Sequence, residues 1–169
     1  ILVIQFSFLS FSKYNKIFGI FCGLIAFVIY SLTVEPTASY WDCAEYISTS
    51  AKLQIGHPPG APLFQMLGAI FSILALNNEQ IAYTVNMMSV TSSAFTIVFL
   101  FWSISLLVKK ILGVGKTIKK NEVIKVFGSS FLGALTSTFT DSFWFNAVEA
   151  EVYAMATLIL SVLFWLGLK

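Results

Sequence analysis

EPTASYWDCAEY, residues 35–46, separates the first apolar segment from the rest of the chain, and GHPPGAP follows it at residues 56–62. Asp42 and Glu45 are three residues apart, a spacing that places both carboxylates on one face of a helix. Because this stretch comes directly after a hydrophobic run, we expect it to lie at a membrane surface. Ionisable groups held near a bilayer are energetically costly, which indicates a functional role for this stretch.

The composition is that of a membrane protein. Of the 169 residues, 57% are hydrophobic and only 11% are charged, whereas about a quarter of the residues in a soluble domain are charged. All ten basic residues are lysines, and the absence of arginine argues against nucleic-acid recognition and against bidentate phosphate binding. Cys22 lies in a hydrophobic segment and Cys43 in the polar stretch, so no disulfide framework is expected.

The local pattern predicts helices throughout. Residues 41–53 are predicted to form a short amphipathic helix with Ser39 as its cap, and residues 57–62 a turn, because prolines interrupt regular structure there. The longer apolar segments follow one another along the chain at residues 17–33, 62–76, 81–108, 126–140 and 152–168. We therefore expect an all-α integral membrane protein with about four spanning helices.

The lysines predict the topology, because they mark the cytoplasmic side of a membrane protein. They precede the first segment and recur between Lys109 and Lys125, so an odd number of crossings separates these two places. The segment 81–108 is the longer candidate, so 62–76 becomes an interfacial or re-entrant helix on the outer side. Five acids from two separate loops then share the outer face: Asp42, Glu45, Asp141, Glu149 and Glu151. A simple avoidance of the cytoplasmic side by acids is the alternative explanation.

These side chains suit chemistry on a sugar or a phosphate. One carboxylate can remove a proton from a hydroxyl while others hold a divalent cation. Glu149 and Glu151 can face one ion in an extended segment but point apart in a helix. The remaining candidates for substrate binding are two tryptophans beside acids, one further acid and two cationic groups that could meet a phosphate: Trp41, Trp144, Asp141, Lys52 and His57.

Each of these residues also has a plain structural interpretation. His57 in a proline-rich turn is more often a structural hydrogen-bonding group than a catalyst. Lys52 could simply extend its ammonium group toward water, and the tryptophans could anchor helices at the interface. Asn86, within an apolar segment, is interpreted as an interhelical hydrogen bond.

Two long motifs resemble a known family. Residues 32–46 together with 52–64, and residues 141–155, are similar to a bacterial family, formerly a domain of unknown function, that is grouped with protein O-mannosyltransferases as glycosyltransferase family 117. The resemblance runs from about residue 14 to residue 169. It differs at Ala44, where the family usually has glycine, and at Ala69, where it often has arginine.

The resemblance implies a GT-C-type helical bundle that transfers a sugar, with mannose expected, from a polyprenyl-phosphate donor to Ser or Thr hydroxyls of a protein or peptide, with inversion. It implies Asp42 as the base with Glu45 beside it, and it implies that Glu149 and Glu151 either hold Mg²⁺ or Mn²⁺ or help to position the donor. It also implies a bacterial inner membrane with the site on the periplasmic side. Residues 13–169 would be the N-terminal membrane module of a larger enzyme, inactive alone, and residues 1–12 stay unassigned.

Two other classes remain open: a transporter and a non-catalytic membrane assembly subunit. A transporter is expected to hold its acids and broken helices near the midplane of the bilayer, whereas these acids follow helix ends. An assembly subunit would tolerate neutral substitutions at Asp42 and Glu45.

Overall fold

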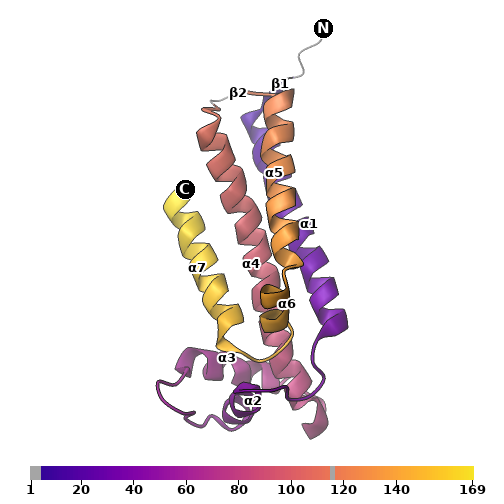
Figure 1. The fold of residues 1–169 in the computed structure, drawn as a ribbon, viewed down its shortest axis with the longest axis vertical. Helices are drawn as coiled ribbons and strands as arrows, with labels where there is room; N and C mark the ends of the chain where they lie inside the picture. The colour runs from indigo at the N-terminus through magenta and orange to yellow at the C-terminus, as the bar shows by residue number, and fades with distance from the viewer. Residues whose placement is uncertain (1–4, 115–116) are drawn as a thin grey trace.

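The computed structural model describes residues 5–114 and 117–169, and most of these residues are helical. Figure 1 shows an elongated bundle of long helices with two shorter helices packed across one end. The elements are β1 (Gln5–Ser7), α1 (Phe8–Thr33), α2 (Cys43–Lys52), α3 (Pro62–Ser72), the 3-10 helix η1 (Asn78–Gln80), α4 (Ile81–Ile111), β2 (Thr117–Lys119), α5 (Lys120–Thr138), α6 (Asp141–Ala147) and α7 (Val152–Leu168). The predicted all-α membrane fold is confirmed.

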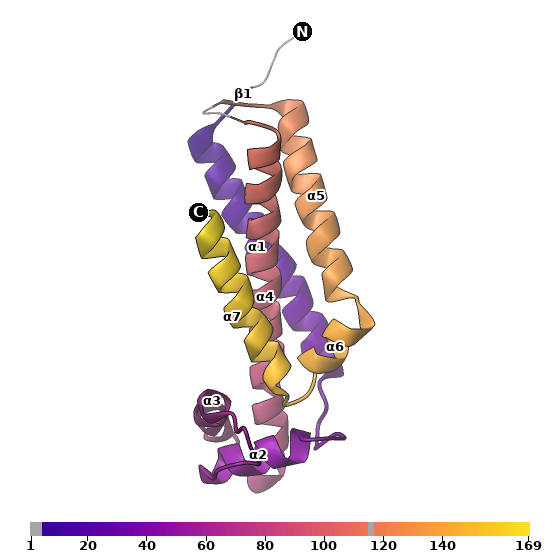
Figure 2. The same ribbon diagram turned by 60° about the vertical axis from the view of Figure 1, so that its left-hand side comes forward.

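Helix α4 is the centre of the bundle, and α1, α5 and α7 each pack against it. Its 31 residues span about 46 Å at 1.5 Å per residue, more than the hydrocarbon core of about 30 Å. The first turns of α4 extend past the end of α7, and α2 and α3 pack there (Figure 2). A separate apolar cluster joins the three elements through Cys43, Ile47, Phe64, Val85 and Met88.

Helices α1 and α4 approach each other closely because α1 offers glycines at the contact. A Cβ atom at Gly23 would lie 2.3 Å from Val98 Cγ2 and 3.1 Å from the Ala94 carbonyl oxygen. Nearer the lysine-rich end, Trp102 Nε1 donates to the Asn15 carbonyl at 3.0 Å. Small residues at such a contact are the usual means by which membrane helices associate.

The number of membrane-spanning helices differs from the four that the sequence predicts. By length and composition α1 and α4 can cross a bilayer, and a third span results if α6 and α7, bent by 110° at their break, count as one. Helix α5, whose first turns carry Lys120, Glu122 and Lys125, is not among these candidate spans. Helix α3, with 11 residues, is too short to span, as predicted.

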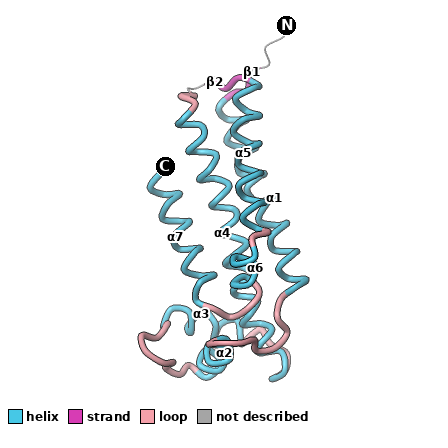
Figure 3. Tube along the Cα trace, in the orientation of Figure 1, coloured by secondary structure: helices cyan, strands magenta, loops and turns pink. Residues whose placement is uncertain are grey.

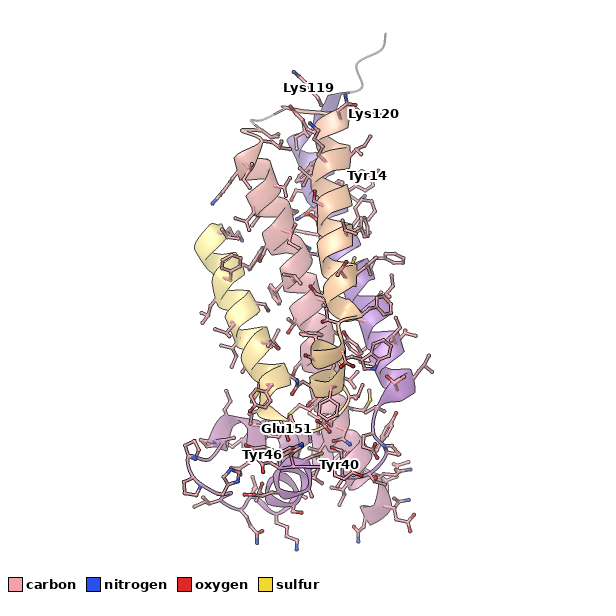
Figure 4. The ribbon with its side chains drawn as sticks, viewed as in Figure 1. Tyr14, Tyr40, Tyr46, Lys119, Lys120 and Glu151 are labelled. Atoms are coloured by element: carbon pink, nitrogen blue, oxygen red, sulfur yellow. The ribbon has the colours of Figure 1, made fainter. Side chains whose placement is uncertain are left out.

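The two ends of the bundle differ in charge. Figure 4 shows Lys119 and Lys120 at one end and Tyr40, Tyr46 and Glu151 at the other. At the lysine end, β1 pairs antiparallel with β2, so part of the unassigned segment 1–12 has a structure; residues 1–4 lie outside the described part. The loops that precede α2 and join α2 to α3 and α6 to α7 gather at the opposite end (Figure 3). The two acidic motifs therefore share one end.

Candidate active site

The loop before α2 is held in place by Asn86 on α4. The Asn86 side chain is fully buried, and its Nδ2 donates to the carbonyls of Glu35 at 2.7 Å and Thr37 at 2.9 Å. Its Oδ1 accepts from Cys43 Sγ at 3.8 Å. Asn86 therefore fixes both sides of the turn that presents Asp42. The predicted interhelical hydrogen bond is present between Asn86 on α4 and Cys43 on α2, and the Asn86 amide also binds two loop carbonyls that the sequence did not indicate.

Asp42 sits at the start of α2 in a tight turn. The preceding residue, Trp41, has a φ of 60°, which is a rare conformation for a bulky residue and one that clusters at functional sites. The predicted cap was wrong: Asp42 is the N-cap residue, and α2 has no side-chain cap. Ser39 is used elsewhere, because its hydroxyl donates to Glu149 Oε2.

Glu45 lies one turn further along the same face of α2 and binds His57. Its Oε1 accepts from the His57 backbone N–H at 2.6 Å, and its Oε2 lies 2.9 Å from His57 Nδ1. These two hydrogen bonds lower the pKa of Glu45, while the hydrogen bond and charge of Glu45, and then the charge of Asp42, raise the pKa of His57. The remaining ring nitrogen, Nε2, lies 3.8 Å from Asp42 Oδ2. One ligand-type atom from each of the three residues falls within 4.8 Å of the others.

Glu149 and Glu151 lie in the non-helical link between α6 and α7, where only 3% and 6% of their surfaces are exposed. Burial raises the pKa of Glu149, against the hydrogen bond from Ser39. The pKa of Glu151 rises to about 7, first through burial and then through the charges of Glu149 and Asp42. Burial of two carboxylates beside a third therefore favours either a bound proton or a bound cation.

The two motifs meet around a cavity of about 280 Å³. It is lined by Trp41, Asp42, Phe145, Asn146, Glu149, Glu151 and Tyr153. Three of these described lining residues are acids and none is cationic, while the aromatic rings provide flat apolar walls of the kind that sugar rings stack on. A second cavity of about 510 Å³ shares Phe145 and Glu149 and adds Glu35, Ser39 and Tyr40 to its lining.

The structure brings some predicted site residues together and leaves others apart. Trp41, Asp42, Glu149 and Glu151 line one cavity, and Glu45 and His57 adjoin it through Asp42. By contrast, three predicted substrate-binding residues do not line it: Lys52, Asp141 and Trp144.

Each of these three residues has its own surroundings. Lys52 is exposed in the last turn of α2, ten residues after Asp42, and Asp141 is exposed in the first turn of α6. The Trp144 ring packs on Tyr30 at 5.9 Å between centroids, and its Nε1 donates to Thr33 Oγ1 at 3.0 Å. Trp144 therefore ties α6 to α1, and the predicted contacts of these residues with substrate stay predictions.

Sequence reasoning missed Ser39, Asn146 and Tyr153 as members of the site. Asn146 and Tyr153 belong to the second motif, where an amide and a phenol close to Glu149 and Glu151 could have drawn attention to them. Ser39 gave no such signal, because its partner Glu149 is 110 positions away in the chain.

Comparison with known proteins identifies relatives of the chain. Residues 42–169 match the family model described as Protein O-mannosyl-transferase TMEM260 N-terminal domain. A curated relative, Protein O-mannosyl-transferase tmem260 of Dictyostelium discoideum, is 28% identical over 141 residues, covering 83% of this chain and 15% of the relative. The chain therefore spans a small part of that relative's length. No solved structure matches the chain.

Proposed function

Because the chain belongs to the protein O-mannosyl-transferase TMEM260 N-terminal domain family, we propose that it carries the reacting carboxylates of a membrane glycosyltransferase. The reaction moves a sugar, mannose in the first instance, from a polyprenyl-phosphate donor to a Ser or Thr hydroxyl of a protein or peptide. The observation that supports this most is the cavity in which Asp42, Glu149 and Glu151 converge at the polar end of a membrane bundle. The site faces the side opposite the lysine-rich end, which is the periplasm for a bacterial inner membrane.

Asp42 is the proposed base. Its side chain is half exposed, so an acceptor hydroxyl can reach it from solvent. Asp42 takes the hydroxyl proton while the oxygen forms its bond to the anomeric carbon. The bond from that carbon to the phosphate oxygen breaks on the opposite face, and the polyprenyl phosphate leaves with the electron pair. Such a single displacement inverts the configuration and needs one base, unlike a glycosidase with two flanking carboxylates.

Glu149 and Glu151 are the proposed ligands of a divalent cation, Mg²⁺ or Mn²⁺. The donor set fits a hard cation, because carboxylate oxygens converge in a cavity whose described lining residues include no basic side chain. A bound cation would offset the negative charge of the donor phosphate. Ser39 orients the Glu149 carboxylate through its hydroxyl, and the exposed Trp41 and Phe145 rings offer faces to the sugar.

The test uses the full-length protein in membranes, supplied with polyprenyl-phosphate mannose and a Ser- or Thr-containing peptide. Mass spectrometry of the peptide is expected to show a gain of one hexose. Asp42→Asn should lower the rate by about 10²- to 10⁴-fold, the usual effect of deleting a general base. Glu79→Gln is the matched control, because Glu79 is an exposed acid outside this cavity.

Three outcomes separate the possibilities. Loss of transfer in Asp42→Asn at equal expression, with Glu79→Gln fully active, supports the enzyme and its base. Equal transfer by all three proteins keeps the enzyme and removes Asp42 as base. No transfer from several sugar donors overturns the enzyme and favours the transporter or assembly interpretation.

A further inference from the structure

His57 lies between the carboxylates of Asp42, the N-cap residue of α2, and Glu45, in its first turn, and does not line the cavity where the sugar would react. Glu45 engages its Nδ1 at 2.9 Å and its backbone N–H at 2.6 Å. A carboxylate accepts hydrogen bonds and donates none, so Nδ1 carries the hydrogen of this bond. In the neutral ring, Nε2 then holds the free lone pair, and Nε2 is the atom that lies 3.8 Å from Asp42 Oδ2.

This geometry is that of an oriented proton acceptor. In acid–base dyads a carboxylate fixes the tautomer of an imidazole and stabilises the imidazolium that forms. The distance from Nε2 to Asp42 is longer than a hydrogen bond, but such contacts often tighten only when substrate is bound. The His57 side chain is 48% exposed, so a proton that reaches it can pass to water.

We propose that His57 is the proton relay of the transferase, receiving at Nε2 the proton that Asp42 takes from the acceptor while Glu45 orients its ring. This inference rests on the proposed function and concerns the same site. His57 acts through Asp42 and does not touch the substrate.

The step balances without another reactant. After the glycosidic bond has formed and the polyprenyl phosphate has left, Asp42 is a neutral carboxylic acid. Its proton moves to His57 Nε2, which restores the Asp42 carboxylate and gives an imidazolium paired with Glu45. The imidazolium then releases a proton to water, and the dyad is ready for the next acceptor.

The charged groups that face His57 favour this direction of transfer. They are Glu45 and Asp42, both negative, and the raised pKa of His57 has its causes in them. Helix α3, which packs on α2, carries no charged residue in its sequence and places Gln65 beside this contact. The neutral form of His57 is the one that accepts a proton, so turnover declines as the pH falls through the raised pKa of His57.

The test compares the pH profiles of full-length variants in the mannose-transfer assay. His57→Gln keeps an N–H for Glu45 but cannot take up a proton, and it is expected to lower kcat by about 10- to 100-fold, at or below the lower end of general-base deletions. In the His57→Gln protein the acid limb of the profile, where the transfer rate falls as the pH is lowered, should move to lower pH. The KM for the donor should not change. Glu45→Gln removes the charge that raises the pKa of His57, so its acid limb should also move to lower pH.

The control is Gln54→Ala, a change of an exposed side chain in the same connection, which should keep both the rate and the acid limb of the unaltered protein. Variants that lower kcat but leave the acid limb in place overturn the relay and indicate a structural role for His57. A raised donor KM with an unmoved limb also overturns it and indicates a contact with the donor phosphate. An unaltered protein that transfers no hexose overturns the proposed function itself.

Discussion

The loop that carries Asp42 is held by the buried side-chain amide of Asn86, and replacing Asn86 should increase the opening of this loop. Asn86→Leu keeps the approximate size of the side chain but removes both hydrogen bonds to the carbonyls of Glu35 and Thr37. The net contribution of one such hydrogen bond is about 0.5–1.5 kcal/mol, so losing two costs the closed loop about 1–3 kcal/mol. A penalty of 2 kcal/mol raises the population of the open loop about 30-fold, because 1.4 kcal/mol is a factor of ten.

The rate at which the Cys43 thiol is alkylated measures how often the loop opens. Cys43 is fully buried at the start of α2 and contacts Asn86 Oδ1, so alkylation by a maleimide requires the loop to open. When closing is faster than alkylation, the rate follows the open population, and the Asn86→Leu protein should react about 30-fold faster. Mass spectrometry of the Cys43 peptide gives the rate, and Cys22, buried in α1, provides an internal reference that should not change.

Ser89→Ala is the matched control. Ser89 lies one turn along α4 from Asn86, is almost fully buried, and its hydroxyl has no hydrogen-bond partner among the described residues. Its removal should leave Cys43 protected. If Cys43 reacts no faster in Asn86→Leu than in Ser89→Ala, the idea that Asn86 holds the loop is refuted.

Three further predictions concern packing, pH and metal. Gly68→Val should lower the melting temperature of the protein, since a Cβ at Gly68 would lie 2.5 Å from Ser50 Oγ and overpacking typically costs about 1–3 kcal/mol; an unchanged melting temperature would contradict close packing of α3 on α2. The connection between α2 and α3 should resist limited proteolysis best between the ordinary pKa of Glu, 4.5, and that of His, 6.5. Because the pKa of His57 is raised, its contribution to the stability of this connection is lost as the pH rises through that pKa. Because the pKa of Glu45 is lowered, its contribution to the same stability is lost as the pH falls through the lowered pKa. Equal cleavage at all pH values would contradict an interaction between His57 and Glu45. Chelation of divalent cations should slow sugar transfer, and Glu149→Gln should be slow with or without added Mn²⁺; full activity of this variant with its metal response intact would remove Glu149 as a ligand.

The long helices could be predicted because hydrophobicity and length decide them. The predicted segment 152–168 coincides with α7, and 81–108 lies within α4. The predicted segment 17–33 ends with α1 but starts nine residues late, since the apolar run before Lys13 continues the same helix. The short helix α6 (141–147) was not predicted, because residues 141–151 were interpreted as a loop, and its bend of 110° relative to α7 depends on packing.

The sequence indicated part of the lining of the candidate cavity, namely Trp41, Asp42, Glu149 and Glu151, but not the contacts between these residues and others. The sequence indicated that Asp42 and Glu149 share one end of the bundle, because lysine positions and the number of crossings decide which loops meet. That Ser39 binds Glu149, or that Asn86 binds the loop before α2, depends on contacts between residues far apart in the chain. Hydropathy carries no information on such contacts.

The division of the carboxylates between exposed and buried positions follows from this architecture and underlies the roles proposed for them. Asp42 and Glu45 lie on a short helix outside the bundle, where water and His57 keep the ionised form of Glu45 favourable. Glu149 and Glu151 lie where the chain bends back into the bundle, and burial there penalises their charge. A group that must accept and release protons at every turnover belongs at the exposed position, whereas buried carboxylates are suited to holding a cation that compensates their charge. This division is why we propose Asp42 and His57 for proton transfer and the α6–α7 link for binding a cation.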